Sequence, residues 1–310
     1  MKKRRPKIVV VGSINMDLVL RCEHLPLPGE TIAASQCVEV SGGKGANQAV
    51  ASAKMGADVE IIGRVGNDVF APQLLRCLNE AGVGTQYVKA CEACGSGLAL
   101  VMVANSGQNS IVIVPAANGQ LSRLDIREVA SVIESADMLL VQLECPLEAV
   151  DEAIAIAQAA GVKILLNPAP APKSLPNRFY KVDIFCPNQT EAELLTGVLV
   201  DGYAAATTAA KMLLDRGAGK VVITLGKDGA CVAERKNNGD EFTSVSSLQV
   251  TAVDTTAAGD AFIGALATYL SEYQELGLAC RKACIAGALA TTKLGAQTSL
   301  PWRAEVEALG

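Results

Sequence analysis

Short apolar segments alternate along this chain with longer segments of helical spacing, and this alternation limits the folds that the chain can adopt. The short segments are β-branched or Leu-rich and apolar on both faces, which is typical of parallel strands covered on both sides. Several of the longer segments end near a Gly, as helices often do. The pattern therefore predicts an α/β fold with a doubly wound, largely parallel sheet. The predicted strands are residues 8–12, 59–63, 138–143, 162–166, 183–187 and 221–225, and the predicted helices are residues 45–55, 71–81, 147–160, 204–216, 257–273 and 276–292.

Two regions interrupt this alternation, because they contain strand-like segments without helices between them. Residues 18–41 read as a strand, a Pro-rich turn and a second strand over residues 31–40. Residues 97–103 and 110–114 read as a second hairpin around Asn105-Ser-Gly107. These four strands predict a small separate β sheet with one uncovered face, which would serve as a lid over a site, a dimer surface, or both. We therefore predict one domain over residues 1–310, with lid strands inserted at about residues 17–41 and 97–114.

The length and net charge of the chain limit the kinds of protein that it can be. With 310 residues, of which 50% are hydrophobic, the chain can bury the core of one large domain. Its net charge of −5 provides no basic surface for nucleic acid, and we interpret the run Lys2-Lys3-Arg4-Arg5 as a solvated tail. No apolar stretch reaches the ~18 residues that span a bilayer, and the N-terminus lacks the pattern of a secretory signal. We therefore expect a cytoplasmic protein without nucleic-acid or membrane partners.

The chain contains one histidine, His24, and ten cysteines. A single His offers little to catalysis by an imidazole base or to His-rich metal binding, so a carboxylate must carry out any acid–base step. Most of the cysteines lie in apolar runs, where Cys acts as a small hydrophobic residue. Cys91-Glu-Ala-Cys94 forms a CxxC motif, but no second CxxC completes a zinc site and no helix is predicted after it. Metal or redox chemistry is therefore not favoured there.

The strongest chemical signal is the segment Val253-Asp-Thr-Thr-Ala-Ala-Gly-Asp-Ala-Phe262, in which a polar turn opens directly into a long apolar helix. The free backbone N–H groups of Ala258, Gly259 and Asp260 would point out of the helix start, where the helix dipole is positive, and small side chains would let a phosphate approach. Asp260 could accept a proton there from an attacking hydroxyl. An ordinary N-cap with Asp in the first turn accounts for the segment equally well.

A second signal is Ser41-Gly-Gly-Lys-Gly-Ala-Asn47, which follows a strand and opens a helix. It is not a Walker A loop, because the pattern GxxxxGK[ST] is absent. Gly42 and Gly43 would let a ligand approach closely, and Lys44 and Asn47 would offer hydrogen-bond donors. A glycine-rich connection with a surface Lys is the alternative.

Further polar residues follow other predicted strands. Asn15 and Asp17 would point the same way from an extended segment and suit adjacent sugar hydroxyls, whereas an Asx turn is the plainer interpretation. Asn188 and Glu191 would either cap a helix or hold phosphate and the waters of Mg²⁺. The turn Thr224-Leu-Gly-Lys-Asp-Gly229 would border a nucleotide or form a simple hairpin. All these segments lie where strands end and helices begin, which is the edge at which open α/β sheets bind ligands.

Together these motifs resemble the ribokinase-like (PfkB) family of carbohydrate kinases over essentially the whole chain. The wider family usually carries Gly-Ala-Gly-Asp where this chain has Ala257-Ala-Gly-Asp260, a form similar to the ribokinase branch. The similar segments are Gly12-Ser-Ile-Asn-Met-Asp17, Gly42-Gly-Lys-Gly-Ala-Asn-Gln-Ala49, Leu166-Asn-Pro-Ala-Pro170, Pro187-Asn-Gln-Thr-Glu-Ala-Glu193, residues 254–262 and Lys293-Leu-Gly-Ala-Gln-Thr-Ser-Leu-Pro-Trp302.

The resemblance implies phosphoryl transfer from ATP to the 5-hydroxyl of D-ribose, with Asp260 as the catalytic base and with Mg²⁺ and K⁺ as cofactors. The sugar would be held by Asn15, Asp17, Gly43, Lys44, Asn47 and Glu144, together with Asp260. ATP would be bordered by Asn188, Thr224, Gly226, Gly229, Gly259 and Cys284, although family members often carry His or Asn at the position of Cys284. Asn188 and Glu191 would organise Mg²⁺ through water, and K⁺ would be held, largely through backbone carbonyls, by Asp254, Thr256, Ala290, Lys293, Gly295 and Ser299.

Two alternatives remain open at this point. The first is a related kinase that acts on 2-deoxyribose, another pentose, fructose or a nucleoside, although Asn15 and Asp17 favour a substrate with vicinal hydroxyls. The second is a non-catalytic sugar-binding protein, which the intact Asp260 and the cation-loop residues disfavour. The uncovered face of the lid sheet further predicts a homodimer.

Overall fold

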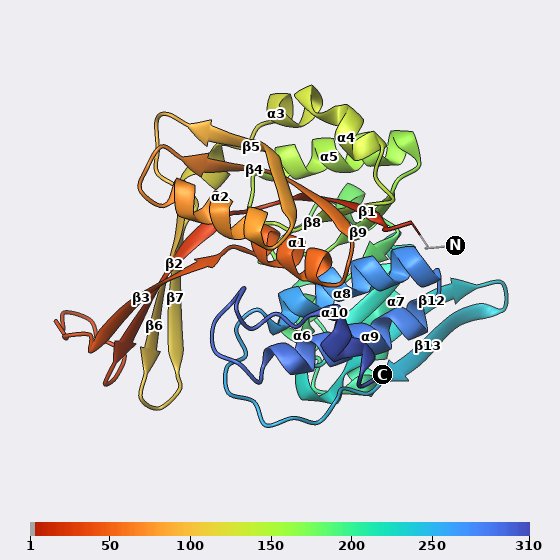
Figure 1. Cartoon of the computed structure of the whole chain (residues 1–310). Coiled ribbons are helices and arrows are strands. Elements are labelled where there is room, and N and C mark those ends of the chain that lie inside the picture. Colours follow the sequence, from red (N-terminus) through yellow and green to blue (C-terminus); the bar gives the residue numbers. More distant parts are fainter. Residues whose placement is uncertain (1–3) are drawn as a thin grey trace.

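The computed structural model describes residues 4–310, so Lys2 and Lys3 of the basic run lie outside the described residues. Within residues 4–310, nine strands form the main sheet in the order β13-β12-β11-β10-β9-β8-β1-β4-β5 (Figure 1). Their bounds are β1 Lys7–Val11, β4 Asp58–Gly66, β5 Val83–Cys91, β8 Met138–Val141, β9 Lys163–Leu166, β10 Ile184–Phe185, β11 Lys220–Thr224, β12 Ala230–Lys236 and β13 Gly239–Val245.

The main sheet is largely parallel, which confirms the predicted doubly wound fold. All strands from β11 to β5 pair in parallel, whereas β12 and β13 add an antiparallel hairpin at one edge. The sequence prediction did not include β5, β12 or β13. It also extended β10 too far, because Pro187 has no N–H with which to continue the ladder.

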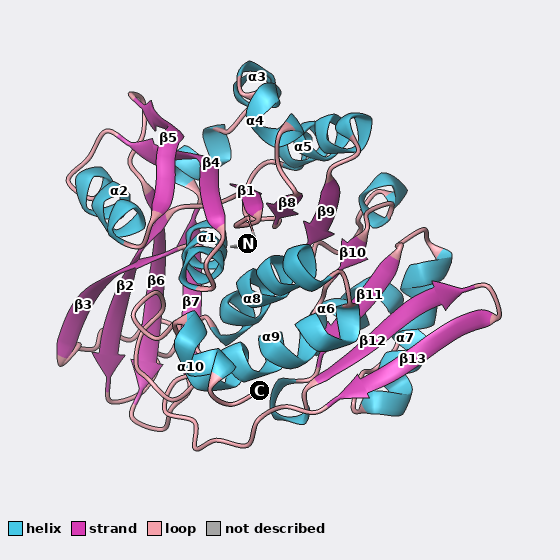
Figure 2. Ribbon diagram, turned by 45° about the vertical axis from the view of Figure 1, so that its right-hand side comes forward, coloured by secondary structure: helices cyan, strands magenta, loops and turns pink. Residues whose placement is uncertain are grey.

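Helices cover both faces of the sheet because alternate residues of its central strands point to opposite sides. In β1, Ile8 and Val10 belong to one core and Val9 and Val11 to the other. The first core is closed by α1 Lys44–Lys54, α2 Ala71–Glu80, α8 Ala258–Tyr273, α9 Leu276–Ala290 and α10 Arg303–Glu307 (Figure 2). The second is closed by α3 Arg123–Glu128, α4 Ala130–Glu134, α5 Leu147–Ala160, α6 Gln189–Thr196 and α7 Tyr203–Asp215. Short 3₁₀ turns occur at η1 Ala116–Gln120, η2 Asn177–Tyr180 and η3 Gly226–Asp228. Over the described part of the chain, no helix is both long enough and apolar enough to cross a membrane.

The predicted lid is a separate four-stranded sheet in residues 4–310, and it projects away from the main body at the lower left of Figure 1. Its order is β3-β2-β6-β7, with β2 Asn15–Cys22, β3 Gln36–Gly42, β6 Gly97–Ala104 and β7 Asn109–Val114. The two hairpins join through parallel pairing of β2 with β6. The strand predicted over residues 31–40 is corrected to β3, because pairing with β2 begins only at Arg21 opposite Gln36.

Candidate active site

The order of the strands along the chain reverses at β1, which pairs with β4 on one side and with β8 on the other. Such a reversal leaves a crevice at the carboxyl ends of the strands. A cavity of about 230 Å³ opens at this edge, and its lining comes from the ends of β9, β10 and β11 and from the starts of α1, α6 and α8. It brings together the predicted residues Lys44, Asn188, Glu191, Thr224, Gly259 and Asp260, and adds Asn167, Ala169, Cys186, Thr255, Ala257 and Ile263.

Asp260 lies in the first turn of α8 and is 8% exposed. Its Oδ2 accepts a hydrogen bond from Nδ2 of Asn47 at 2.9 Å, and its Oδ1 accepts one from Nε2 of Gln48, also at 2.9 Å. Both amides come from α1, so the glycine-rich helix start and the α8 start form one site. Asn47 was predicted, whereas Gln48 was not singled out, although it is the next residue of the same motif.

The start of α8 is open toward the cavity. Ala257, the residue before the helix, has a φ of 58°, and no side chain caps the helix. The first-turn N–H groups therefore lack the side-chain acceptor that an ordinary N-cap would supply, which leaves them available to an anion. A Cβ on Gly259 would meet no heavy atom within 4 Å, so a ligand can approach the backbone there.

Asp17 lies on β2, on the same side as Asn15, and faces this region from the lid. Burial, reinforced by the negative charges of Glu144 and Asp260, raises the pKa of Asp17 to about 7, although Lys44 acts in the opposite direction. Its Oδ1 is buried and finds no hydrogen-bond partner among the described residues. A buried carboxylate oxygen without a donor is a suitable acceptor for a ligand hydroxyl.

Glycines make room for these polar groups. A Cβ on Gly42 would lie 2.1 Å from Oδ2 of Asp17, so a larger residue would displace that carboxylate. Gly43 has a φ of 89°, and a Cβ there would lie 2.8 Å from the backbone nitrogen of Asn15. The Gly42-Gly43 pair is therefore required by close packing around the predicted sugar residues, and not only by a turn.

Asn15 is oriented by a residue that the sequence did not reveal. Asn118, in η1, donates from Nδ2 to Oδ1 of Asn15 at 2.6 Å and accepts at its own Oδ1 from the N–H of Ile14 at 2.9 Å. The amide group of Asn15 is therefore held with its NH₂ group directed away from Asn118. No sequence signal linked these two residues, since they lie on unrelated segments.

Glu144 follows β8 and joins the first strand to the glycine-rich helix. It accepts a hydrogen bond from Oγ of Ser13 and another at Oε2 from the backbone N–H of Lys44 at 3.1 Å. Burial acts to lower the pKa of Lys44, but the surrounding carboxylates, chiefly those of Asp260 and Glu144, outweigh burial and raise it. The Lys44 side chain therefore remains a cation within a ring of carboxylates.

Asn188 and Glu191 form a reciprocal capping box at the start of α6. Oδ1 of Asn188 accepts from the N–H of Glu191, and Oε2 of Glu191 accepts from the N–H of Asn188, both at 2.8 Å. The capping interpretation is confirmed, and both residues also line the cavity. Burial raises the pKa of Glu191, and the nearby charge of Asp260 adds to this effect. Thr224, which ends β11, is paired with Asn188 and lies on the same wall.

Three residues predicted to border ATP do not line this cavity. Gly226 and Gly229 lie in and after η3, within the turn that joins antiparallel β11 and β12, as the hairpin interpretation predicted. Packing requires a glycine at position 229, because a Cβ there would lie 2.0 Å from the carbonyl oxygen of Val245. Cys284 is 4% exposed on α9, within the hydrophobic core.

The residues predicted to hold K⁺ lie on the loop before α8, at the end of α9 and on the loop after α9, and Asp254 connects the two loops. Oδ1 of Asp254 accepts from the N–H and Oγ1 of Thr256, at 2.9 and 2.6 Å, and Oδ2 accepts from the N–H of Gly295 at 2.9 Å. Burial favours the neutral form of Asp254, but these hydrogen bonds lower its pKa overall. Ser299 is fully buried and donates from Oγ to the carbonyl of Ala296 at 2.8 Å. The donor set is carbonyl, hydroxyl and carboxylate oxygen, which fits a hard monovalent cation.

Comparison with known proteins agrees with this geometry. Residues 5–303 match the model of the pfkB family of carbohydrate kinases. The chain is 40% identical to the ribokinase of Haemophilus influenzae over 301 residues, which cover 97% of each chain. It is 39% identical to the deoxyribokinase of Salmonella typhi over 295 residues, which cover 95% of each chain.

The chain belongs to the pfkB family of carbohydrate kinases. Its structure is similar to that of the ribokinase of Arabidopsis thaliana complexed with ribose and ATP, with a TM-score of 0.90, 31% identity and 99% of each chain covered. This carbohydrate kinase is therefore an enzyme that transfers a phosphoryl group to a sugar. The predicted family and fold are both confirmed.

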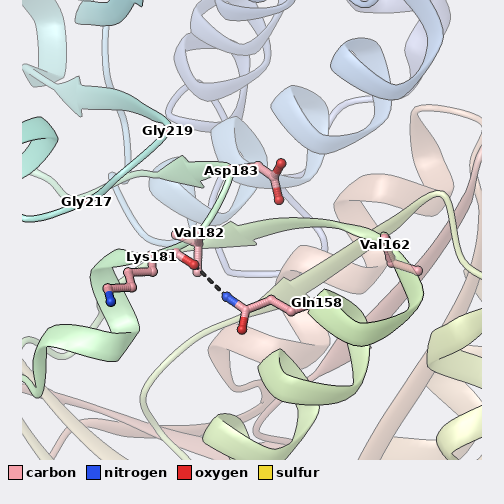
Figure 3. Close-up of a pocket in the computed structure, with 8 residues that line it drawn as sticks. Gln158, Val162, Lys181, Val182, Asp183, Gly217 and Gly219 are labelled. Atoms are coloured by element: carbon pink, nitrogen blue, oxygen red, sulfur yellow. Dashed lines mark hydrogen bonds between the residues drawn. The ribbon is translucent and has the colours of Figure 1, made fainter.

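A second and larger hollow, of about 570 Å³, lies at the opposite edge of the sheet of this pfkB kinase (Figure 3). Lys181, Asp183 and Gln158 contribute its polar lining. Nε2 of Gln158 donates to the carbonyl of Lys181 at 2.6 Å, and the Asp183 carboxylate accepts from the N–H of Ile164 at 2.8 Å. The side chains of Gln158 and Asp183 thus bond to the protein itself, and no set of polar groups converges on the hollow, so it lacks the character of a catalytic site.

The CxxC motif is separate from the site. Cys91 ends β5, and its Sγ lies 2.8 Å from Sγ of Cys94. The chain then continues into strand β6 without a helix, as predicted. Among residues 4–310, no group of three His, Cys, Asp or Glu side chains is placed to hold a metal ion.

Proposed function

We propose that this pfkB kinase transfers the γ-phosphoryl group of ATP to the 5-hydroxyl of D-ribose, with Asp260 as the base. The observation that carries the proposal is the position of Asp260, which shares one cavity with Lys44, Glu191 and the open start of α8. A carboxylate beside an uncapped helix start combines a proton acceptor with an anion site. The relatives named above support a pentose as the acceptor.

The chemistry follows from the two sides of the cavity. On the lid side, Asn15, Asp17, Gly43, Lys44, Asn47 and Glu144 would hold the sugar. On the other side, Asn188 and Thr224, with Gly259 at the start of α8, would border ATP. Gly226, Gly229 and Cys284 would meet the nucleotide beyond the cavity. The bond between the sugar oxygen and the γ-phosphorus forms as the bond from phosphorus to the leaving oxygen of ADP breaks, and the hydroxyl proton passes to Asp260.

Charge stabilisation and positioning would account for most of the rate, because the transition state of phosphoryl transfer is loose. The N–H groups at the start of α8 and the cationic Lys44 would face the negative charge on the transferred group. The lid sheet would exclude water and so limit hydrolysis of ATP.

Two metal ions would complete the site. Asn188 and Glu191 present oxygen atoms at the cavity wall that would hold Mg²⁺ through water, and Mg²⁺ would neutralise charge on the phosphates. The oxygens of Asp254, Thr256, Ala290, Lys293, Gly295 and Ser299 would hold K⁺, which would stabilise the shape of the loop that starts α8.

The lid would also form the contact of a homodimer in the cytoplasm, where ATP is available. Strand pairing places Asp17, Ala99 and Ile113 side by side on one face of the lid sheet. Ile111 lies two residues from Ile113 on the same strand, so its side chain is on the same face. Ile111 and Ile113 are 54% and 42% exposed in the single chain. An apolar face of this kind beside a site supports coverage by a second copy.

A sugar panel tests the proposed reaction. ADP release would be measured with Mg²⁺ and ATP, with and without K⁺, on D-ribose, 2-deoxy-D-ribose, D-fructose and a nucleoside. We expect D-ribose to give the highest kcat/KM, with K⁺ stimulation, and ³¹P NMR to place the phosphate on the 5-oxygen. A higher kcat/KM for 2-deoxy-D-ribose would select the alternative that the Salmonella typhi relative represents. The absence of ribose-dependent ADP release would contradict the proposal.

A further inference from the structure

Gln48 is fully buried and does not line the cavity, yet it is bonded to the carboxylate at the centre of the site. Its Nε2 donates both to Oδ1 of Asp260 at 2.9 Å and to Oδ1 of Asn167 at 3.1 Å. Its Oε1 accepts from Nε2 of Gln142 at 2.6 Å. We propose that Gln48 is a positioning residue for phosphoryl transfer, which holds the Asp260 carboxylate in its reactive orientation. This inference rests on the proposed role of Asp260 as the base.

The direction of these hydrogen bonds is determined by a backbone carbonyl. The carbonyl oxygen of Cys186 can only accept, so Asn167 must turn its NH₂ group toward it, at 2.9 Å. The Oδ1 atom of Asn167 then faces Gln48 and can only accept. Gln48 must therefore place its NH₂ group, and not its oxygen, between Asn167 and Asp260.

The opposite end of Gln48 agrees with this orientation. Its Oε1 faces the NH₂ group of Gln142, which is 1% exposed. A flipped Gln48 would bring its oxygen against the oxygens of Asp260 and Asn167, and its NH₂ group against that of Gln142. The contacts with Asp260 and Asn167 would then be repulsive, so these two oxygens determine the orientation of the amide.

The backbone beneath Gln48 is closely packed as well. A Cβ on Gly264 of α8 would lie 2.5 Å from Cβ of Ala51 and 2.8 Å from the carbonyl oxygen of Gln48, so α1 and α8 touch where this glycine allows it. Oγ of Ser52 donates to the carbonyl of Gln48 at 2.8 Å. The donor is thus held on a rigid helix pair, and its contact with Asp260 does not depend on a mobile loop.

The position of Gln48 predicts which kinetic constant it affects. It lies behind the cavity wall and reaches a ligand only through Asp260 and Asn167, so its loss should leave substrate binding nearly intact and misplace the carboxylate in the transition state. A displacement of about 1 Å at a reacting group lowers the rate by up to about 10²-fold. We expect Gln48→Met to lower kcat by about 10- to 100-fold while KM for sugar and for ATP changes by less than about threefold.

A double-mutant cycle tests this inference with four proteins: wild type, Gln48→Met, Asp260→Asn and the double variant. If Gln48 acts through the base, Gln48→Met should lower the residual turnover of Asp260→Asn by less than about threefold. A merely structural role would lower both backgrounds by the same factor, and that additive result would overturn the inference. The matched control is Gln158→Met, which removes a Gln amide from the opposite edge of the sheet and should leave kcat unchanged.

A second variant keeps the test decisive if Gln48→Met does not fold. Gln142→Met removes the donor to Oε1 of Gln48 and lies one residue farther from Asp260, so we expect a loss of about three- to tenfold in kcat with unchanged KM. Normal kcat in a folded Gln48→Met or Gln142→Met, together with an inactive Asp260→Asn, would overturn this inference alone. Near-normal turnover by Asp260→Asn would instead overturn the proposed base.

Discussion

Oδ2 of Asp254 accepts a hydrogen bond from the backbone N–H of Gly295 at 2.9 Å, which joins the loop before α8 to the loop after α9. In the other direction, the N–H groups of Val253 and Asp254 both donate to the carbonyl of Thr291. Each loop therefore donates hydrogen bonds to the other. Because the start of α8 is the proposed anion site, the geometry of this junction bears directly on catalysis.

Removal of the Asp254 carboxylate should therefore abolish stimulation by K⁺. We expect Asp254→Ala to lower kcat by about tenfold or more in saturating K⁺ and to make turnover independent of K⁺ concentration. A K⁺ titration of initial rates measures both effects. Asp215→Ala, on the exposed surface of α7, is the control and should retain normal stimulation. Unchanged K⁺ dependence in Asp254→Ala would contradict the cation site.

Asp260→Asn should nearly abolish turnover. It keeps the shape of the side chain but removes the proton acceptor, and loss of a general base lowers kcat by about 10²- to 10⁴-fold. The dissociation constant for ribose, measured by isothermal titration calorimetry, should change by only a few-fold. A variant with near-normal turnover would show that another group accepts the proton.

Sugar binding should weaken below about pH 7 because of Asp17, whose pKa is raised to about 7 in the unliganded protein. Sugar hydroxyls donate to the charged carboxylate, so at pH values below this pKa binding must release a proton. Affinity should then fall by up to about tenfold per pH unit as pH decreases, and should level off above about pH 7.5. Calorimetry in buffers of different ionisation enthalpy measures the released proton. Asp17→Asn should bind more weakly and lose this pH dependence; a persistent dependence would exclude Asp17 as its source.

Ala257→Gly should stabilise the fold. Ala257 has a φ of 58°, a left-handed conformation that costs a residue with a Cβ about 1 kcal/mol and costs Gly almost nothing. Part of this gain is offset by the greater freedom of Gly in the unfolded chain, so we expect about 0.5 kcal/mol in the free energy of unfolding. The control is Ala258→Gly, which lies in the right-handed helix and should destabilise by about 0.5–1 kcal/mol. Equal effects of the two substitutions in urea titrations would refute this explanation.

Ile111→Lys should convert a dimer into a monomer. Ile111 is 54% exposed on the lid face that also carries Asp17, and a buried Lys without a partner would oppose association. Light scattering at several concentrations gives the mass of each form. Leu124→Lys, at a 64% exposed position on α3, is the matched control and should remain dimeric. A wild-type protein that is monomeric at all concentrations would refute dimerisation through the lid.

Much of the fold could be predicted because its signals are local. The apolar strands, the helix ends at Gly and the helix-free region of the lid all depend on neighbouring residues, and the structure contains each of them. The edge strands β5 and β13 were missed because they are partly exposed and lack a continuous apolar run. Strand β12 lies inside the sheet and was missed although its first four residues are buried and mostly apolar. Strand β3 was predicted to start too early, since the first residue of a strand depends on the partner strand and not on its own composition.

The doubly wound class, the lid and motif residues such as Lys44 and Asp260 could be read from the amino-acid sequence, because periodicity and helix-start chemistry reside in contiguous residues. The folded chain alone shows that Asn118 orients Asn15, that Gln48 is bonded to both Asp260 and Gln142, and that Gly226 and Gly229 do not line the cavity. The reason is physical: a hydrogen bond between distant segments depends on the direction of both side chains and on the packing of the backbones that carry them, and neither quantity is encoded in one short motif.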